Sequence, residues 1–344
     1  MIYLNNAATT AAKPESYYSA DSASEWEAKE KLACLFGCDG EYETILTEGG
    51  SQAIKAAIYG LIRPGDHVIS TDMEYGETLE ALNEIEGKGC TVSYIPVNSY
   101  GTVMYELIER AVNDKTRAIV CCHGSNVTGN MVDLGKVGLI ARRNNLLLIS
   151  DGCQTAGAAE IRLSETGADA FCFTGHKKLM GPYGTGGICL RKGIELSRDA
   201  ESVLTAPSEE KLGKLCASLD FIREKGLYGV SILPHRLAKR FFEAVKSMKD
   251  VKVYGDFGTN MRIPTVAISV EGFSAQEIKE FMRKKGIVVR SGGFDSPRLM
   301  RSFGMEKQGL VRFSFGYFNT RRDVNEAILA LMELLAIEDF YLLS

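Results

Sequence analysis

From about residue 43 the chain alternates short apolar runs with longer stretches of helical period. The apolar runs occupy 44–47, 67–70, 90–97, 117–122, 146–150, 169–173 and 187–190. Amphipathic stretches lie between them, at 51–62, 76–87, 103–113 and 133–144. Continuous apolar strands that alternate with helices are typical of a mostly parallel sheet covered by helices on both faces. The pattern therefore predicts an α/β fold.

The pattern changes after about residue 200. Two long helical stretches are followed by alternating apolar runs and helices, at 208–225, 231–249, 263–270, 274–285, 287–290 and 311–316, and then by a C-terminal helix. This α+β arrangement predicts a second, smaller domain. We expect a large domain at 15–200 and a small domain at 201–344 that also includes the N-terminal segment 1–14.

Composition excludes several classes of function. The 344 residues include 40 basic and 44 acidic side chains, a formal net charge of −4, so the chain lacks the basic character of nucleic-acid-binding proteins. No apolar run approaches the roughly 20 residues that span a bilayer. The N-terminus has neither the basic nor the apolar region of a secretory signal. We therefore expect a cytoplasmic protein with neither nucleic acid nor a membrane as partner.

The nine cysteines are an odd number and are scattered along the chain. Without a secretory signal they are expected to be reduced thiols, most of them small buried hydrophobic residues. Cys34 and Cys38 form one C-x3-C pair, but no second pair lies at the spacing of a zinc ribbon. We expect no metal site.

Polar residues follow four of the predicted strands at the point where each strand ends. A glycine–serine turn (49–51) opens a helix, a polar loop occupies 123–129, Asp151 and Gln154 follow the run at 146–150, and Thr174–Lys178 follows the run at 169–173. Ligands of parallel α/β sheets bind beyond the carboxyl ends of the strands. Each feature also has a structural explanation: a serine N-cap, an aspartate N-cap or a solvated lysine pair.

Taken together, the four features fit pyridoxal phosphate (PLP). This cofactor needs a lysine for a Schiff base, a carboxylate that keeps the pyridine nitrogen protonated, donors for the ring hydroxyl, and a helix N-terminus for the phosphate. The sequence has neither the dinucleotide-binding pattern after its first strand nor a P-loop. PLP is therefore the predicted cofactor.

Five stretches resemble the class V aminotransferases and, within them, the cysteine desulfurases. They are YLNNAATT (3–10), SNVTG (125–129), DGCQTAG (151–157), FTGHKKLMGPYGTGG (173–187) and VRFSFGYFNT (311–320). The resemblance implies a fold-type I PLP-dependent enzyme with a large PLP-binding domain built on a mostly parallel seven-stranded sheet. It also implies a homodimer with the active site near the subunit interface.

The resemblance assigns roles by position. Lys177 would form the Schiff base and move the substrate α-proton, and Asp151 would pair with the pyridinium nitrogen. Gln154 would donate to the ring hydroxyl, and Asn126 would contact that hydroxyl or the substrate carboxylate. The phosphate would be held by Gly50, Ser51, Thr174 and His176.

The substrate side of the site follows from the same resemblance. Arg312 would clamp the substrate α-carboxylate, a task that suits its planar fork. Asn6, with the neighbouring Ala7 and Ala8, would line the substrate pocket. Tyr75 stands where the family has a histidine stacked on the cofactor ring; a tyrosine can stack, but its ordinary pKa near ~10 makes it a poorer acid–base group.

The chain departs from the family pattern where the sulfur-accepting cysteine is expected. The family pattern R-x-G-x-x-C corresponds here to the stretch from Arg290 to Asp295, both of which we expect among the substrate-binding residues. A carboxylate at position 295 cannot accept sulfur as a persulfide. Two segments, 14–26 and 190–211, are also shorter than in the family.

These features lead to three hypotheses. The first is a cysteine desulfurase-like lyase that cleaves a Cβ–S or Cβ–Se bond without a cysteine nucleophile, releasing pyruvate, ammonia and a thiol or persulfide for a possible sulfur or selenium acceptor protein. The second is a class V aminotransferase acting on another amino acid. The third is a degenerate PLP-binding homologue with a partner-binding role.

Overall fold

The computed structural model describes the backbone of residues 1–38 and 40–342. The strands are β1 (Ile2–Tyr3), β2 (Tyr42–Thr47), β3 (His67–Thr71), β4 (Thr91–Ile95), β5 (Thr116–Cys122), β6 (Leu147–Asp151), β7 (Ala170–Thr174), β8 (Gly186–Arg191), β9 (Val251–Tyr254), β10 (Thr265–Val270), β11 (Ile287–Val288), β12 (Arg290–Gly292) and β13 (Leu310–Ser314). The helices are α1 (Glu15–Tyr18), α2 (Glu25–Phe36), α3 (Gly50–Leu61), α4 (Gly76–Gly87), α5 (Tyr105–Ala111), α6 (Leu134–Arg143), α7 (Leu163–Thr166), α8 (Arg198–Glu201), α9 (Glu209–Lys225), α10 (Leu227–Val245), α11 (Ala275–Lys284), α12 (Pro297–Ser302) and α13 (Arg321–Leu342).

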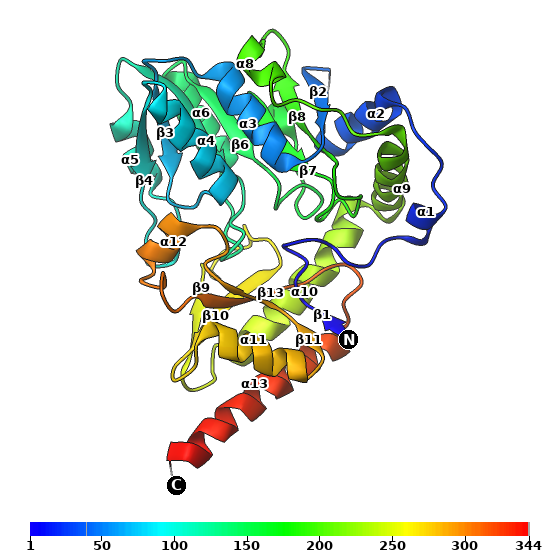
Figure 1. The fold of residues 1–344 in the computed structure, drawn as a ribbon, viewed down its shortest axis with the longest axis vertical. Coiled ribbons are helices and arrows are strands. Elements are labelled where there is room, and N and C mark those ends of the chain that lie inside the picture. The colour runs from blue at the N-terminus through cyan, green and yellow to red at the C-terminus, as the bar shows by residue number, and fades with distance from the viewer. Residues whose placement is uncertain (39, 343–344) are drawn as a thin grey trace.

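A seven-stranded sheet forms the centre of the larger layer, in the order β2-β8-β7-β6-β5-β3-β4 (Figure 1). Five consecutive strands, from β7 to β4, pair in parallel. β8 is antiparallel to both of its neighbours, β7 and β2. The predicted mostly parallel α/β sheet is therefore confirmed.

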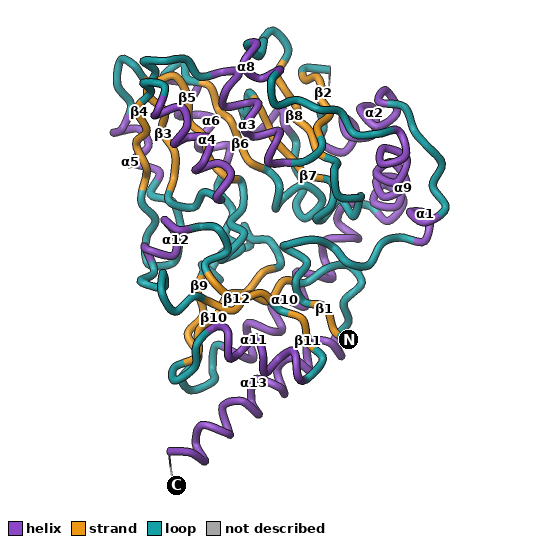
Figure 2. The backbone as a smooth tube through the Cα atoms, viewed as in Figure 1, coloured by secondary structure: helices purple, strands orange, loops and turns teal. Residues whose placement is uncertain are grey.

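Side-chain alternation along the buried strands explains why helices cover both faces of this sheet. In β7, Phe171 and Phe173 join one hydrophobic cluster with α2, α5, α6 and α9, whereas Ala170 and Cys172 join another with α3, α4 and α8. Successive residues of a strand point to opposite faces, so a strand buried on both sides must be apolar at every position. The tube view shows helices on both sides of these strands (Figure 2).

The smaller layer is a four-stranded antiparallel sheet in the order β12-β13-β10-β9. Its core packs α10, α11 and α13 against the strands, with Phe241 and Phe313 in contact at 4.4 Å between ring centroids. The single run expected at 287–290 divides in two: Ile287–Val288 pairs with the N-terminal β1, and Arg290–Gly292 pairs with β13. The N-terminal segment thus belongs to the small sheet's side of the molecule, as Figure 1 shows.

Helix α9 bears on the predicted domain boundary. Its apolar residues Leu212, Leu215 and Leu219 lie in the hydrophobic cluster of the large sheet, and it packs against α2. The division after residue 200 stays a prediction.

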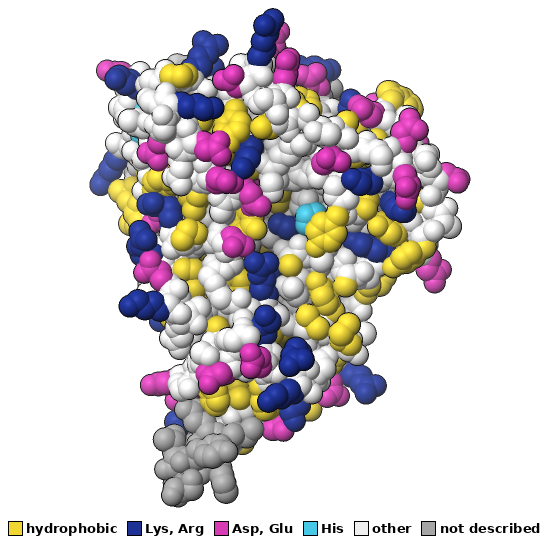
Figure 3. All heavy atoms as spheres, viewed as in Figure 1, with side chains coloured by type: hydrophobic (Ala, Val, Ile, Leu, Met, Phe, Trp, Pro, Cys, Tyr) yellow, Lys and Arg dark blue, Asp and Glu magenta, His cyan; other side chains and the backbone are white. Residues whose placement is uncertain are grey.

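The distribution of surface charge and the burial of the cysteines agree with the expectations from composition. On the face drawn in Figure 3, acidic and basic side chains are interspersed. Eight of the nine cysteines are buried, as expected, and Cys34 is exposed. Within the described part of the chain, every helix is too short or too polar to cross a lipid bilayer.

Candidate active site

A cavity of about 470 Å³ lies at the carboxyl ends of the parallel strands, where the large sheet faces the small one. Its walls come from the turn before α3, the loops after β5, β6 and β7, the start of α4, the N-terminal segment, and strands β12 and β13. Segments far apart in the sequence therefore supply one site. This volume is in the usual range for a small-molecule pocket.

Lys177 lies in the loop after β7 and lines the cavity. The N-terminal segment fixes this loop: the Thr10 hydroxyl donates to the Lys177 carbonyl at 2.7 Å, and the Thr9 hydroxyl donates to the His176 carbonyl at 3.0 Å. The Lys177 ammonium lies 5.8 Å from the centroid of the Tyr75 ring. The amine is thus held on the same side of the cavity as an aromatic face.

Asp151 and Gln154 reach the cavity from the end of β6. Asp151 is buried, and its Oδ1 accepts a hydrogen bond from the Cys153 amide at 2.9 Å. Gln154 donates from Nε2 to the Ala7 carbonyl at 3.0 Å, while its Oε1 is buried without a hydrogen-bond partner among the described residues. A buried carbonyl oxygen without a donor is costly, so the site is completed by a group that donates a hydrogen bond.

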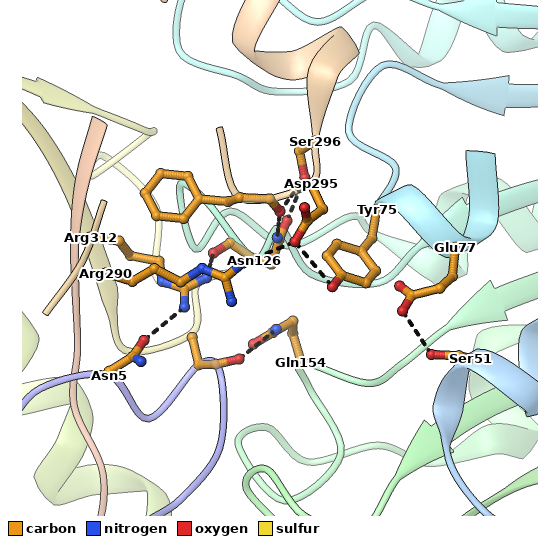
Figure 4. Close-up of polar contacts among 12 residues, drawn as sticks. Asn5, Ser51, Tyr75, Glu77, Asn126, Gln154, Arg290, Asp295, Ser296 and Arg312 are labelled. Atoms are coloured by element: carbon orange, nitrogen blue, oxygen red, sulfur yellow. Dashed lines mark hydrogen bonds and ion pairs between the residues drawn. The ribbon is translucent and has the colours of Figure 1, made fainter. Parts of the chain in front are cut away.

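Helix α3 begins at the cavity, so the free amides of its first turn are available to an anion bound there. Only glycine fits at position 50, because a Cβ there would lie 2.1 Å from the Cys153 sulfur. The Ser51 hydroxyl donates to Oε1 of Glu77 at 3.0 Å (Figure 4). Glu77, on α4, also lines the cavity, and its Oε2 is buried without a partner among the described residues.

His176 and Thr174 lie beside this helix terminus. The Thr174 hydroxyl and His176 Nδ1 are 2.9 Å apart, and the imidazole stacks on Tyr183 at 4.3 Å between ring centroids. Burial, together with the nearby charges of Lys177 and Lys13, lowers the pKa of His176 to about 4. The imidazole is therefore neutral at physiological pH and offers one N–H donor.

Arg312, on β13, is a buried guanidinium without a carboxylate partner among the described residues. Nη1 donates to the Asn126 carbonyl at 2.7 Å, Nη2 donates to Asn5 Oδ1 at 3.1 Å, and Nε has no partner. Burial and the charge of Arg290 lower its pKa to about 9. An anion bound in the cavity would relieve both the missing hydrogen bond and the unbalanced charge.

Asp295 lies beside Arg290, the strand partner of Arg312, and contacts Arg290 and Tyr75 (Figure 4). Arg290 Nη2 is 3.0 Å from Asp295 Oδ2, and the Tyr75 hydroxyl donates to the same oxygen at 3.4 Å. Burial and the nearby carboxylates of Glu77 and Asp295 raise the pKa of Tyr75 to about 12. Tyr75 thus keeps its proton throughout the physiological range.

Asn126 fixes the loop that carries Asp295. Its Nδ2 donates to the Phe294 carbonyl at 2.8 Å, and its Oδ1 accepts from the Ser296 hydroxyl at 2.9 Å. Asn126 lines the cavity, but both ends of its amide are engaged by this loop. The geometry therefore gives Asn126 a positioning contact that the sequence did not predict.

Asn6 and Asp295 are the two predicted site residues that do not line the cavity: Asp295 lies behind Arg290 and Tyr75, which do, and Asn6 is turned away. Asn6 Nδ2 donates to the carbonyl of Ser314 and to Asn319 Oδ1, both at 3.0 Å. Asn5, its neighbour, faces the other way and reaches Arg312. Successive residues of an extended segment point to opposite sides, so a shift of one position separates the two roles.

Sequence reasoning missed several residues that line the cavity or support its walls, among them Asn5, Glu77, Cys153 and Ser296. Glu77 follows Tyr75 by two positions at the start of a helix, and Cys153 lies within the DGCQTAG stretch. Their positions close to predicted site residues in the sequence could have indicated that they belong to the site. Their contacts, however, join residues that are far apart in the sequence. Ser51 and Glu77 are 26 positions apart, and Asn126 and Ser296 are 170 positions apart.

The residues of the cavity fit PLP. The lysine, the strand-end carboxylate and the α3 terminus match the groups that the cofactor requires. The resemblance makes Gln154 a donor to the ring hydroxyl, but Nε2 donates to the Ala7 carbonyl and the atom left without a partner among the described residues is Oε1, so in this structure Gln154 would accept from that hydroxyl instead.

Comparisons with known proteins agree with this geometry. A sequence model of the aminotransferase class-V family matches residues 2–326. A probable cysteine desulfurase of Halalkalibacterium halodurans is 26% identical over 87% of this chain and 79% of its own length. A cysteine desulfurase IscS of Vibrio vulnificus is 26% identical over 88% of this chain and 78% of its own length.

Solved structures show the same fold. The apo structure of a cysteine desulfurase from Thermococcus onnurineus superimposes with a TM-score of 0.87 at 22% identity, covering 97% of this chain and 94% of that one. The cysteine desulfurase CsdA of Escherichia coli gives a TM-score of 0.84 at 22% identity, with the same coverage of both chains. The chain belongs to the class V aminotransferase family, and it is a PLP-dependent enzyme of the cysteine desulfurase-like type.

Proposed function

We propose that this enzyme is a lyase that cleaves the Cβ–S or Cβ–Se bond of a cysteine-like amino acid without a cysteine nucleophile. One observation carries the proposal: the groups for chemistry at the α-carbon are assembled, but the cavity offers no thiolate. Of the nine cysteines, all within the described residues, Cys153 alone lines the cavity. Burial and the charge of Asp151 raise the pKa of its thiol well above the ordinary value.

The proposal divides the work among the residues of the cavity. PLP, when bound, supplies an electron sink for the negative charge that develops at the α-carbon. Lys177 Nζ would hold the cofactor and, once released by the substrate amine, would move the α-proton, and Asp151 would pair with the ring nitrogen. Arg312 binds the α-carboxylate and thereby fixes which bonds of the α-carbon face the lysine. Tyr75, whose ring centroid lies 5.8 Å from Lys177 Nζ, would border the cofactor ring.

The phosphate would lie at the start of α3. Gly50 and Ser51 would offer backbone amides and a hydroxyl, and Thr174 and the neutral His176 would add donors. Gln154 and Asn126 would border the ring hydroxyl. Asp295 would stand beside the substrate side chain, where it cannot take over sulfur.

The net reaction needs no oxidant. Lys177 removes the α-proton, the Cβ–S bond breaks with its electron pair on sulfur, and water completes the conversion of the remaining fragment into pyruvate and ammonia. A thiolate or persulfide is a good leaving group because its negative charge is stable in water near neutral pH.

The test is to incubate the PLP-loaded protein with cysteine, cystine and selenocysteine and to measure pyruvate, alanine and sulfide. Pyruvate that forms in step with released thiol supports the proposal. Alanine with an equal amount of sulfide would instead mean desulfuration and would overturn it. Lys177→Ala should abolish both products, and Lys192→Ala, on the exposed surface, is the matched control.

A class V aminotransferase acting on another amino acid is the second candidate. Arg312 and Lys177 serve that reaction equally well, because neither contact depends on a leaving group. Loss of the yellow cofactor absorbance after addition of an amino donor, with its return after addition of a keto acid, would favour it. A protein that never becomes yellow with PLP would favour a partner-binding role.

We also propose that the enzyme works in the cytoplasm as a homodimer and passes its sulfur or selenium product to an acceptor protein. Tyr183, stacked on His176 at the cavity, is 64% exposed, so this rim is available for a second copy. Light scattering of the purified protein tests the dimer. A monomer that retains full activity would contradict it.

A further inference from the structure

Binding of the substrate α-carboxylate does not require the ion pair of Arg290 and Asp295, because we assign that carboxylate to Arg312. Arg290 lines the cavity, and Asp295 contacts two lining residues, Arg290 and Tyr75; their exposed fractions of 40% and 55% place the pair at the rim of the site. Both contacts of the carboxylate use Oδ2. Among the described residues, Asp295 Oδ1 and Arg290 Nη1 have no hydrogen-bond partner. An acceptor and a donor therefore remain side by side.

Strand pairing places this pair close to Arg312. Arg290 and Arg312 are direct partners in the antiparallel pair β12–β13, so their side chains leave the sheet on the same face. Arg312 is buried at the base of the cavity wall, and Arg290 is partly exposed. The two guanidinium groups thus line one cavity at two levels of burial.

The loop that carries Asp295 is held in a strained conformation. Phe294 and Asp295 are consecutive non-glycine residues with φ of 55° and 56°, in the left-handed region. Asn126 binds the loop on both sides of Asp295, and Phe294 is 3% exposed. Strain of this kind persists where the surrounding structure over-determines it, which is common at functional sites. The carboxylate is accordingly fixed in place.

The charge pattern selects among the possible leaving groups. A purely anionic group would meet the Asp295 carboxylate, and a purely cationic group would meet the Arg290 guanidinium. A zwitterion pairs its carboxylate with Arg290 and its ammonium with Asp295, so each charge of the ion pair meets a charge of opposite sign. The head group of a second α-amino acid has this pattern.

We propose that Arg290 and Asp295 form a subsite for a leaving group that is itself an amino acid. The substrate class is then a pair of amino acids joined through sulfur or selenium, of which cystine is the simplest. This assignment rests on the proposed lyase function. With cystine, the α-proton goes to Lys177, the Cβ–S bond breaks, and the electron pair leaves on the sulfur of cysteine persulfide. Cystine and water give cysteine persulfide, pyruvate and ammonia, with no external oxidant or reductant.

Four disulfides of cysteine test the subsite, because they differ only at the far end. Cystine carries both charges there, the cysteamine disulfide carries the ammonium, the 3-mercaptopropionate disulfide carries the carboxylate, and S-methylthiocysteine carries neither. The measurement is kcat/KM for pyruvate formation by the PLP-loaded enzyme. We expect kcat/KM for cystine to exceed that for S-methylthiocysteine by about tenfold, which corresponds to about 1.4 kcal/mol shared between two partly exposed charge pairs.

Variants are compared by this preference, the ratio of kcat/KM for cystine to that for S-methylthiocysteine, because a ratio is insensitive to the fraction of folded protein. Asp295→Asn should lower the preference severalfold and remove the advantage of the cysteamine disulfide. Arg290→Gln should remove the advantage of the mercaptopropionate disulfide. The exposed pair Arg301–Glu306, also five residues apart, offers matched controls in Arg301→Gln and Glu306→Gln.

The outcomes separate the two proposals. Equal kcat/KM for all four disulfides, or a preference that survives both substitutions, would refute the subsite while the lyase function stands. No pyruvate from any of the four, with the cofactor bound, would refute the lyase function itself.

Discussion

Replacing Glu77 with glutamine should tighten the binding of PLP. In the structure the Glu77 carboxylate accepts a hydrogen bond from the Ser51 hydroxyl, with 3.0 Å between the two oxygen atoms. Ser51 lies at the start of α3, where we place the cofactor phosphate. The second oxygen of the Glu77 carboxylate is buried without a partner among the described residues. The phosphate must take over the Ser51 hydroxyl and must also tolerate the nearby negative charge. Glu77 therefore competes with the cofactor.

The size of the effect follows from the contact distances. A hydrogen bond of 3.0 Å followed by one of about 2.8 Å places carboxylate and phosphate about 6 Å apart. Glu77 is partly exposed, so the dielectric constant of water gives a lower bound of about 0.7 kcal/mol per pair of unit charges. A phosphate that carries nearly two charges doubles this to about 1.4 kcal/mol, or about tenfold in the dissociation constant.

Titration of the apo-protein with PLP, followed by absorbance, measures the change. Pyridoxal, which lacks the phosphate, is the internal control: its affinity should not respond to Glu77→Gln. Glu80→Gln is the matched variant, because Glu80 lies one turn further along α4 and pairs with Lys55 at 2.7 Å instead of facing the cavity. Equal gains for PLP and pyridoxal, or no gain for PLP, would refute the reasoning.

The other predictions concern the thiol, the lysine, a buried histidine and the tight packing at α3. With cysteine as substrate, Asp295→Cys should form alanine in place of part of the pyruvate. The sulfur should remain on the new cysteine as a persulfide, which mass spectrometry detects as one added sulfur atom. Pyruvate alone would show that substrate sulfur does not reach this position. Lys177→Ala should lose the yellow absorbance that PLP gives with the wild-type protein, and a retained band would assign the Schiff base to another lysine. Burial lowers the pKa of His123 to about 4, so the folded protein holds it neutral while the unfolded chain titrates near ~6.5. Its contribution to stability is present above pH ~6.5 and is lost as the pH falls toward 4, by up to about 3 kcal/mol, and His123→Gln should flatten that part of the urea-unfolding profile. Gly50→Ala should destabilise the protein by about 1–3 kcal/mol, and Cys153→Ala in the same chain should restore part of the loss, because the added methyl group would meet the Cys153 sulfur; thermal unfolding of the single and double variants measures this coupling.

The sequence was informative about the large sheet for a physical reason. Strands buried on both faces must be apolar throughout, and the groups that follow them must converge at one edge. Asp151, Lys177 and the α3 turn were therefore predictable from position alone. The antiparallel direction of β8 was not, since a strand buried on both faces has the same apolar composition in either direction.

Other elements left a weaker trace. Helix α2 was not predicted, because only Ala28, Leu32 and Phe36 are buried among charged neighbours. Asn5 and Asn6 could not be told apart, since which of two adjacent side chains faces a cavity depends on the strand that pairs with the segment. Glu77 gains its role from one contact with Ser51 on another helix, which no local pattern encodes.

The division of labour between the two sheets has a mechanical consequence. The groups assigned to the cofactor follow strands of the large sheet, whereas Arg290 and Arg312 both lie on the small one. Several polar contacts fix one set relative to the other: Arg312 donates to the Asn126 carbonyl at 2.7 Å, the buried Lys178 donates to the Phe315 carbonyl at 2.7 Å, and Asn126 donates to the Phe294 carbonyl at 2.8 Å. Because a shift of about 1 Å between reacting groups costs orders of magnitude in rate, these contacts set the catalytic alignment as much as the reacting groups do. Lys178, next to Lys177, thus connects the large sheet to the small one through its hydrogen bond to Phe315. From the sequence, the only structural explanation for the two lysines was a solvated surface pair.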